Sequence, residues 1–336
     1  MLARPSTTPQ KGRVPSRTRG GLAAFAAAAA SFALTAAAPA PPADPTVQLA
    51  RLPDGRHLAF RCTGSGTPTV ILEGGWAASS LAWSKVQRLV TPLTRVCSYD
   101  RAGLGLSDPG PAPRDGTAIV RDLDEGLRAL KIAGPFVVAG HSAGGLYVRA
   151  FADRRPGDVV GMVLVDPSVE HQNTRMRAVF GPGAGSTDPL RDRTAACLAA
   201  AKAYALPSPD PKLIKCAAAT PVATWETEVS ELDNLWGATS DEVASGRSSY
   251  GALPLIVLTA ADTNAAVPEP ARRVVDRVWA GLHQELAEHS TIGVRRTVER
   301  TGHLIPKDRP DAVADAIAEV VKTARGEPLG TPRPIG

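Results

Sequence analysis

Hydrophobic positions from about residue 46 onwards form short, near-continuous runs, separated by stretches in which apolar residues recur at helical spacing. Four runs bounded by turn residues are typical of strands buried on both faces: residues 69–72, 136–139, 159–165 and 253–259. Between two of them, Ile119, Leu123 and Leu127 fall on one face of a helix. Buried strands that alternate with helices predict an α/β fold, with a mostly parallel sheet covered on both faces.

Weaker signals complete this pattern. Four more strands are expected, the first two joined by an Asp54-Gly55 hairpin turn: residues 46–52, 57–62, 95–99 and 294–299. Helices are expected at residues 81–90, 143–152 and 270–288 and around Val313, Ile317 and Val320. The strands together make a sheet of eight.

The alternation of strands and helices stops at residues 168–250. This region has Gly/Pro-rich pieces and helical stretches without a clear strand. It lies between two strands, so we expect a helical lid over the carboxyl edge of the sheet, where α/β sheets bind ligands. The core then consists of residues 44–167 and 251–325, and residues 326–336 form a flexible tail.

Residues 1–43 have the composition of a targeting segment. A basic stretch ends at Arg19, an apolar run spans residues 22–38, and small residues precede Pro41. These are the parts of a cleaved secretory signal, followed here by a Pro-rich linker. We therefore predict a secreted or periplasmic protein without stable membrane association once the signal is removed. An uncleaved membrane anchor is the alternative.

Charge and cysteine content exclude several classes of function. The formal net charge is +5, but five basic residues precede the first acidic one, and the rest of the chain is nearly balanced. No basic stripe with interleaved aromatic residues is present, so nucleic acid is not expected as a partner. No C-x-x-C or Cys/His cluster has zinc spacing, so neither a metal nor another cofactor is expected.

The strongest chemical signal is Gly140-His141-Ser142-Ala143-Gly144. It is a G-x-S-x-G motif placed between a buried strand and a helix, the context in which the serine becomes an exposed nucleophile. The two outer glycines avoid clashes across the tight turn. The backbone N–H of Ala143, at the start of the helix, can donate to an oxyanion.

A serine nucleophile needs a general base, and His303 is the best candidate. It follows the last strand, on a loop before the final helix, and comes last in the order Ser…Asp…His. His141 adjoins the serine and is expected to point away from its hydroxyl. The other histidines have no strand-end context.

Two carboxylates could orient the imidazole of His303. Asp166 ends the strand after the predicted nucleophile helix, and Asp262 follows the strand at residues 253–259. Asp166 could instead cap the start of the lid, and Asp262 could form an Asx-turn with Asn264. Both satisfy the strand-end requirement, so both stay open.

Together these residues give the chain a resemblance to α/β-hydrolases of the bacterial secreted esterase and lipase kind. The matching pieces are Leu72-Glu73-Gly74-Gly75, residues 99–107, the motif at 140–145 and Gly302-His303. The resemblance implies an α/β-hydrolase fold and a second oxyanion donor from the N–H of Gly75 or Trp76. Glu73 departs from the family, which usually has histidine there.

The resemblance also bears on the acid and on the cysteines. Relatives commonly place the acid after the strand that precedes the long last helix, but the aligned position here is Thr263, and some relatives place it one strand earlier. The family's strand order makes the strands of Cys62 and Cys97 neighbours, so a disulfide between them is plausible. Cys197 and Cys216 could pair within the lid; four free buried thiols are the alternative.

These features predict a serine hydrolase that cleaves a small to medium carboxylic ester through an acyl-enzyme on Ser142. Its partner would be the small-molecule ester alone; the sequence leaves the substrate's identity and the oligomeric state open. The same scaffold hosts peptidases, carbon–carbon bond hydrolases and cofactor-free haloperoxidases. A non-catalytic binding protein is the alternative from another class.

Overall fold

The computed structural model describes residues 46–182, 188–203 and 220–327. The predicted signal and linker at residues 1–43, most of the predicted tail and Cys216 lie outside these ranges.

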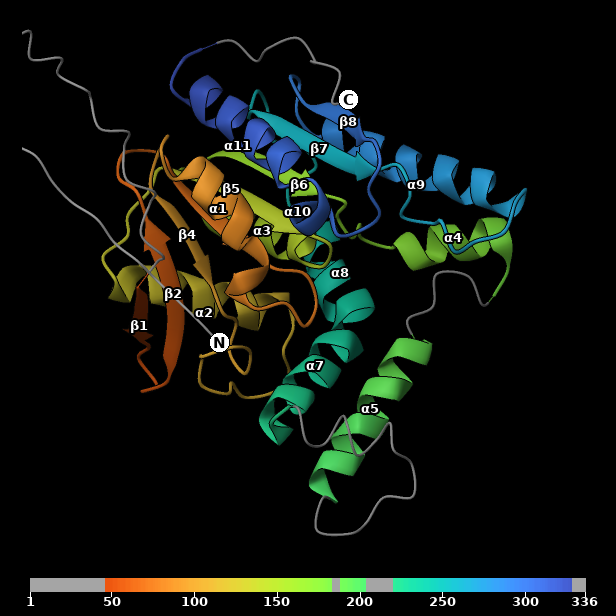
Figure 1. Ribbon diagram of the computed structural model, residues 1–336, viewed down its shortest axis with the longest axis horizontal. Helices are drawn as coiled ribbons and strands as arrows, with labels where there is room; N and C mark the ends of the chain where they lie inside the picture. The colour runs from red at the N-terminus through yellow and green to blue at the C-terminus, as the bar shows by residue number, and fades with distance from the viewer. Residues whose placement is uncertain (1–45, 183–187, 204–219, 328–336) are drawn as a thin grey trace, which may run out of the picture. The chain divides into compact units, whose positions relative to one another are not determined.

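One eight-stranded sheet forms the centre of the described chain, in the order β1-β2-β4-β3-β5-β6-β7-β8 (Figure 1). β2 pairs antiparallel with β1 and β4, and every other neighbouring pair is parallel. The predicted α/β-hydrolase fold, with its mostly parallel sheet, is confirmed. The strands are β1 (Val47–Arg51), β2 (His57–Thr63), β3 (Thr69–Glu73), β4 (Val96–Tyr99), β5 (Phe136–His141), β6 (Val159–Val165), β7 (Leu255–Ala260) and β8 (Val294–Val298).

The continuous apolar runs became the central strands because these strands are covered on both faces. Every residue of β3, β5 and β7 is buried, as expected for a parallel sheet between two helical layers. The edge strand β1 is mostly exposed. The hairpin at Asp54-Gly55 is confirmed: Gly55 has a φ of 91° and its N–H donates to Leu52 O at 3.0 Å.

Helices pack against both faces of the sheet and enclose two hydrophobic clusters. One cluster joins the sheet to α2, α3 and α9, and the other joins it to α1 and α11. The helices of the core are α1 (Ser84–Val90), α2 (Gly116–Ala129), α3 (Gly144–Arg154), α9 (Ala271–Glu288), α10 (Ile305–Asp308) and α11 (Pro310–Ala324).

The helix expected at residues 81–90 is shorter than predicted. A 3₁₀ turn, η1 (Ser80–Trp83), precedes α1. The Ser80 N–H donates to the buried carboxylate of Asp100 at 2.6 Å, and the Trp83 side chain is buried. These tertiary contacts fix the chain in a tighter turn than the periodicity indicated.

The chain between β6 and β7 is helical wherever the structure describes an element in it. It holds α4 (Gln172–Phe180), α5 (Asp188–Lys202), α7 (Val222–Asn234), the π-helical turn η2 (Leu235–Thr239) and α8 (Ser240–Ala244). In Figure 1, α5 and α7 lie side by side beyond one edge of the core. α5, α7 and η2 contribute side chains to the cavity beside Ser142, which follows β5.

A disulfide joins Cys62 to Cys97, as the resemblance implied. The two residues are direct partners in the register of β2 and β4, so the bond links neighbouring strands. Cys197 is also disulfide-bonded, and its predicted partner Cys216 lies outside the described residues.

Candidate functional site

Two glycines build the turn that carries Ser142. β5 ends at His141 and α3 begins at Gly144, so Ser142 stands between strand and helix with a φ of 54°. A Cβ on Gly140 would lie 2.4 Å from the carbonyl oxygen of Gly144, and a Cβ on Gly144 would lie 2.6 Å from that of Gly74. The turn is therefore too tight for side chains there. It holds Ser142 in a left-handed backbone conformation that residues other than glycine rarely adopt.

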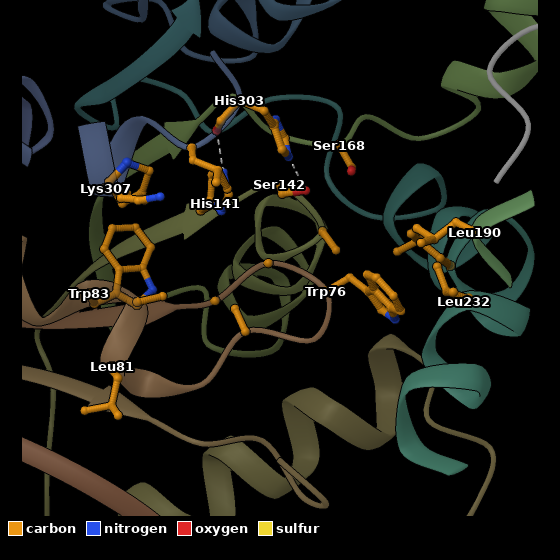
Figure 2. A pocket seen from close by; sticks show the side chains of 18 of the residues that line it. Trp76, Leu81, Trp83, His141, Ser142, Ser168, Leu190, Leu232, His303 and Lys307 are labelled. Atoms are coloured by element: carbon orange, nitrogen blue, oxygen red, sulfur yellow. Dashed lines mark hydrogen bonds between the residues drawn. The ribbon is translucent and has the colours of Figure 1, made fainter. Parts of the chain in front are cut away.

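His303 connects Ser142 to Asp166. Its Nε2 lies 2.9 Å from Ser142 Oγ, and its Nδ1 lies 2.7 Å from Asp166 Oδ2. In Figure 2 the ring of His303 is directed toward Ser142. When Nδ1–H donates to the carboxylate, Nε2 is left as an acceptor for the serine hydroxyl. The structure thus brings three of the predicted residues into one hydrogen-bonded chain.

The carboxylate of Asp166 is held in place by four donors. Besides His303, the Ala260 N–H, Trp279 Nε1 and Thr263 Oγ1 donate to it at 3.1, 3.0 and 2.6 Å. Burial by itself raises the pKa of Asp166, but the hydrogen bonds from His303 and Thr263 help to bring that pKa below its usual value. The side chain is therefore an ionised acceptor inside the protein.

Asp262, the other candidate acid, is not hydrogen-bonded to His303. It is exposed on the turn after β7, where its backbone N–H donates to Thr301 O at 3.0 Å. The next residue, Thr263, occupies the position that aligned with the family's usual acid, and its hydroxyl donates to Asp166. That departure from the family pattern was the one signal in the sequence for the role of Thr263.

His141 has a role that the sequence did not indicate. Its Nε2 donates to the carbonyl oxygen of His303 at 2.8 Å, and the two rings are 4.8 Å apart. Burial, together with the neighbouring His303, lowers the pKa of His141 to about 4, so the ring is neutral at pH 7. His141 therefore holds the backbone of the His303 loop while, as predicted, it stays away from the Ser142 hydroxyl. Its partner is 162 residues away along the chain, which is why no local pattern revealed it.

The three predicted oxyanion donors lie around Ser142. Ala143 is buried at the start of α3, and Gly75 approaches so closely that a Cβ on it would lie 3.1 Å from Ser142 Cβ. Among the described residues, the backbone N–H groups of Gly75, Trp76 and Ala143 have no hydrogen-bond acceptor. They are therefore available to a ligand bound at Ser142.

A cavity of about 530 Å³ opens beside Ser142. Figure 2 shows Ser142 between two groups of side chains, with Trp76, Leu190 and Leu232 on one side and Leu81 and Trp83 on the other. The large apolar side chains in the wall are Trp76, Leu81, Trp83, Leu190, Leu232, Leu235, Trp236 and Leu304. The site can therefore bury apolar groups on both sides of the serine.

No group of three or more His, Cys, Asp or Glu residues in the described ranges could hold a metal ion. The groups that the site offers for chemistry are the serine, the imidazole, the carboxylate and the backbone donors.

His283 is hydrogen-bonded to the residue after Asp166, and it makes the stability of the folded protein depend on pH. Its Nε2 donates to Pro167 O at 3.0 Å, and its Nδ1 accepts from Thr259 Oγ1 at 2.9 Å. Burial lowers the pKa of His283 to about 4. In the unfolded chain this histidine is protonated below about pH 6.5, whereas in the folded protein it is protonated only below about pH 4. His283 therefore contributes stability that is full above pH 6.5 and is lost as the pH falls toward 4.

We expect His283 to contribute about 3 kcal/mol to the fall in unfolding free energy over this interval. The measurement is urea denaturation at several pH values between 7.5 and 4 for the wild type and His283→Gln. The variant should show a correspondingly shallower dependence on pH, although it is less stable at pH 7. Parallel curves for the two proteins would contradict the assignment. The comparison cancels the titration of all other groups.

The chain is similar in sequence to known α/β hydrolases. Residues 70–316 match the sequence model described as the alpha/beta hydrolase family. The lipase LipV of Mycobacterium tuberculosis is 28% identical over 190 residues, which cover 55% of this chain and 67% of the lipase. The chain spans less than half the length of each of the first three curated relatives it matches.

Solved structures show the same fold. A haloalkane dehalogenase loop variant from Bradyrhizobium elkanii superposes with a TM-score of 0.61 at 17% identity, over 84% of this chain and 98% of the other. A thermophilic esterase from Thermogutta terrifontis superposes with a TM-score of 0.55 at 19% identity, over 83% of this chain and 99% of the esterase. At these identities the likeness concerns the fold alone.

The predicted secreted or periplasmic location is contradicted by the relatives. An uncharacterized vacuolar membrane protein of Saccharomyces cerevisiae is 32% identical over 127 residues, which cover 36% of this chain and 20% of that protein. The prediction rested on an Ala-rich run of weak hydrophobicity, a composition that does not by itself distinguish a cleaved signal from other apolar segments. Within the described ranges, no helix is both long and apolar enough to cross a membrane.

Proposed function

Because the chain belongs to the α/β-hydrolase family, we propose that it is a serine hydrolase that cleaves carboxylic esters through an acyl-enzyme on Ser142. One observation carries the proposal. The Ser142 hydroxyl lies 2.9 Å from an imidazole whose other nitrogen lies 2.7 Å from a buried carboxylate. This is the arrangement that makes a serine hydroxyl nucleophilic.

In the first half of the reaction, His303 Nε2 accepts the proton of Ser142 as its oxygen attacks the ester carbonyl. Asp166 keeps the other ring nitrogen protonated and stabilises the imidazolium that forms. The free N–H of Ala143, with that of Gly75 or Trp76, donates to the oxyanion. His303 then protonates the leaving alcohol, and a water activated by His303 hydrolyses the acyl-enzyme.

The cavity supports an ester of small to medium size. Its volume of about 530 Å³ lies within the usual range for small-molecule sites. The apolar side chains on the two sides of Ser142 suit an acyl group on one side and an alcohol group on the other. The similar lipase favours this substrate class. Haloalkane dehalogenation, the chemistry of another structural neighbour, needs a carboxylate nucleophile where this chain has Ser142.

The test is covalent labelling of the purified protein with a fluorophosphonate, followed by peptide mass mapping, together with turnover of p-nitrophenyl esters of increasing acyl length. We expect a single adduct on the peptide that contains Ser142 and hydrolysis of the shorter esters. A folded protein that neither labels nor turns over any ester would refute the proposal and favour a non-catalytic binding protein. Labelling without ester turnover would instead point to another substrate class for the same serine.

A further inference from the structure

Three charged side chains are buried together behind the loop of Gly74 and Gly75. The side chains of Arg101, Glu73 and Glu231 are 2%, 1% and 1% exposed. Arg101 Nη1 donates to Glu73 at 2.7 Å, while Nε and Nη2 donate to Glu231 at 2.8 and 2.9 Å. Removing charges from water is costly even when they are paired, so such a cluster beside a reaction site suggests a specific use.

The same guanidinium also binds the backbone of the loop. Nη1 donates to Gly74 O at 2.9 Å and Nη2 donates to Gly75 O at 2.8 Å. With the bonds to the two glutamates, all five N–H groups of Arg101 have an acceptor. A lysine, with three donors on one tetrahedral nitrogen, cannot reproduce this set.

These bonds determine where the loop's N–H groups point. In a planar trans peptide the N–H is antiparallel to the preceding carbonyl. Because the carbonyls of Gly74 and Gly75 face Arg101, the N–H groups of Gly75 and Trp76 face away from it. The loop lies directly against Ser142, and these N–H groups have no acceptor in the described part of the chain.

Helix α7 holds Arg101 in this position. Glu231 belongs to α7, 130 residues from Arg101 along the chain. A second bond, from Trp76 Nε1 to Glu228 O at 2.9 Å, ties the same loop to the same helix. A Cβ on Gly103 would lie 1.9 Å from Thr227 Oγ1, so α7 also packs tightly on the chain just after Arg101.

We propose that Arg101 is the positioning residue of the oxyanion hole, and that Glu231 of α7 fixes it there. Helix α7 is accordingly a structural part of the reaction site rather than a free cover. This inference rests on the proposed function, since it assigns the loop N–H groups to a developing oxyanion. Donors that are already oriented stabilise the transition state without reorganisation during the reaction.

The test compares the wild type with Arg101→Lys, Glu231→Gln and the control Glu170→Gln. Glu170 makes a comparable pair with Arg149, another buried arginine, and has no hydrogen bond to the loop of Gly74 and Gly75. The readouts are kcat and KM for a p-nitrophenyl ester, the inhibition constant of a trifluoromethyl ketone and the melting temperature. The ketone is used because it forms a tetrahedral adduct with an active serine. Ser142→Ala is measured in parallel.

We expect Arg101→Lys to lower kcat about 100-fold with KM nearly unchanged, and to weaken the ketone by a similar factor. Glu231→Gln should lower kcat about 10-fold, and Glu170→Gln should change it less than 3-fold at a comparable melting temperature. If Arg101→Lys does not fold, Glu231→Gln decides the question. Unchanged kcat and ketone affinity in the folded variants, or an equal loss in Glu170→Gln, would overturn the positioning role. A wild type that turns over no ester would overturn the proposed function and this inference with it.

Discussion

Replacing Ser142 by alanine is expected to lower kcat/KM for an ester by about 10⁶-fold. The variant keeps the cavity, the backbone N–H groups and the pair of His303 and Asp166, but it has no atom that can form the acyl-enzyme. The activity that remains should reflect binding and oxyanion stabilisation alone. Initial rates of p-nitrophenyl ester hydrolysis at high enzyme concentration measure it.

The control for this substitution is Ser245→Ala. Ser245 is exposed just after α8, and its hydroxyl donates only to Glu242 O at 2.8 Å. This variant should keep kcat/KM within about 2-fold, because exposed polar truncations have small effects. If Ser142→Ala retained most of the activity while folding normally, the nucleophile would have to be another residue.

Replacing Asp166 by asparagine is expected to lower kcat about 10⁴-fold. The carboxylate accepts four hydrogen bonds, two on each oxygen, whereas an amide can accept on one side only. If the NH₂ group faced His303, the ring would have to protonate Nε2 and could no longer accept from Ser142. If the NH₂ group faced the other side, it would meet the N–H groups of Ala260 and Trp279, and buried donors would be left without acceptors.

Asp262→Asn is the matched control for the acid. This carboxylate is exposed on the turn after β7, so its replacement should leave kcat within about 2-fold. Steady-state kinetics of both variants, with melting temperatures to verify folding, distinguish the two carboxylates. A large loss in Asp262→Asn together with an active Asp166→Asn would contradict the role that the geometry indicates.

The sequence alone was sufficient to predict the sheet and to propose Ser142 and His303 as candidates, which the structure brings within hydrogen-bonding distance. Strands such as β6 appear as continuous apolar runs, because a strand buried on both faces has almost no polar positions. Ser142 stood out because its turn is a local structure, made by a strand end, a helix start and two glycines within five residues. His303 was found from its place after the last strand. The helix at 81–90 was predicted too long, since the bond from Ser80 to Asp100 is a tertiary contact.

The acid could not be chosen from the sequence. β6 and β7 are neighbours in the sheet, and both end in a carboxylate at the same edge, so the strand-end argument applied to each equally. What distinguished them was a set of donors from separate parts of the chain, including Thr263 after β7 and Trp279 on α9. These donors orient Asp166 toward His303, and no local pattern specifies them.

Local patterns therefore determined the features that depend on a few neighbouring residues. These are the buried strands, the turn that carries Ser142 and the loop that carries His303. Only the tertiary structure decided which carboxylate binds His303 and which side chains hold the loop of Gly74 and Gly75. The physical reason is that hydrogen bonds among buried polar groups are specific in direction and distance, while their partners lie anywhere in the chain. Arg101 shows this most clearly, because its acceptors come from residues 73 to 75 and from residue 231.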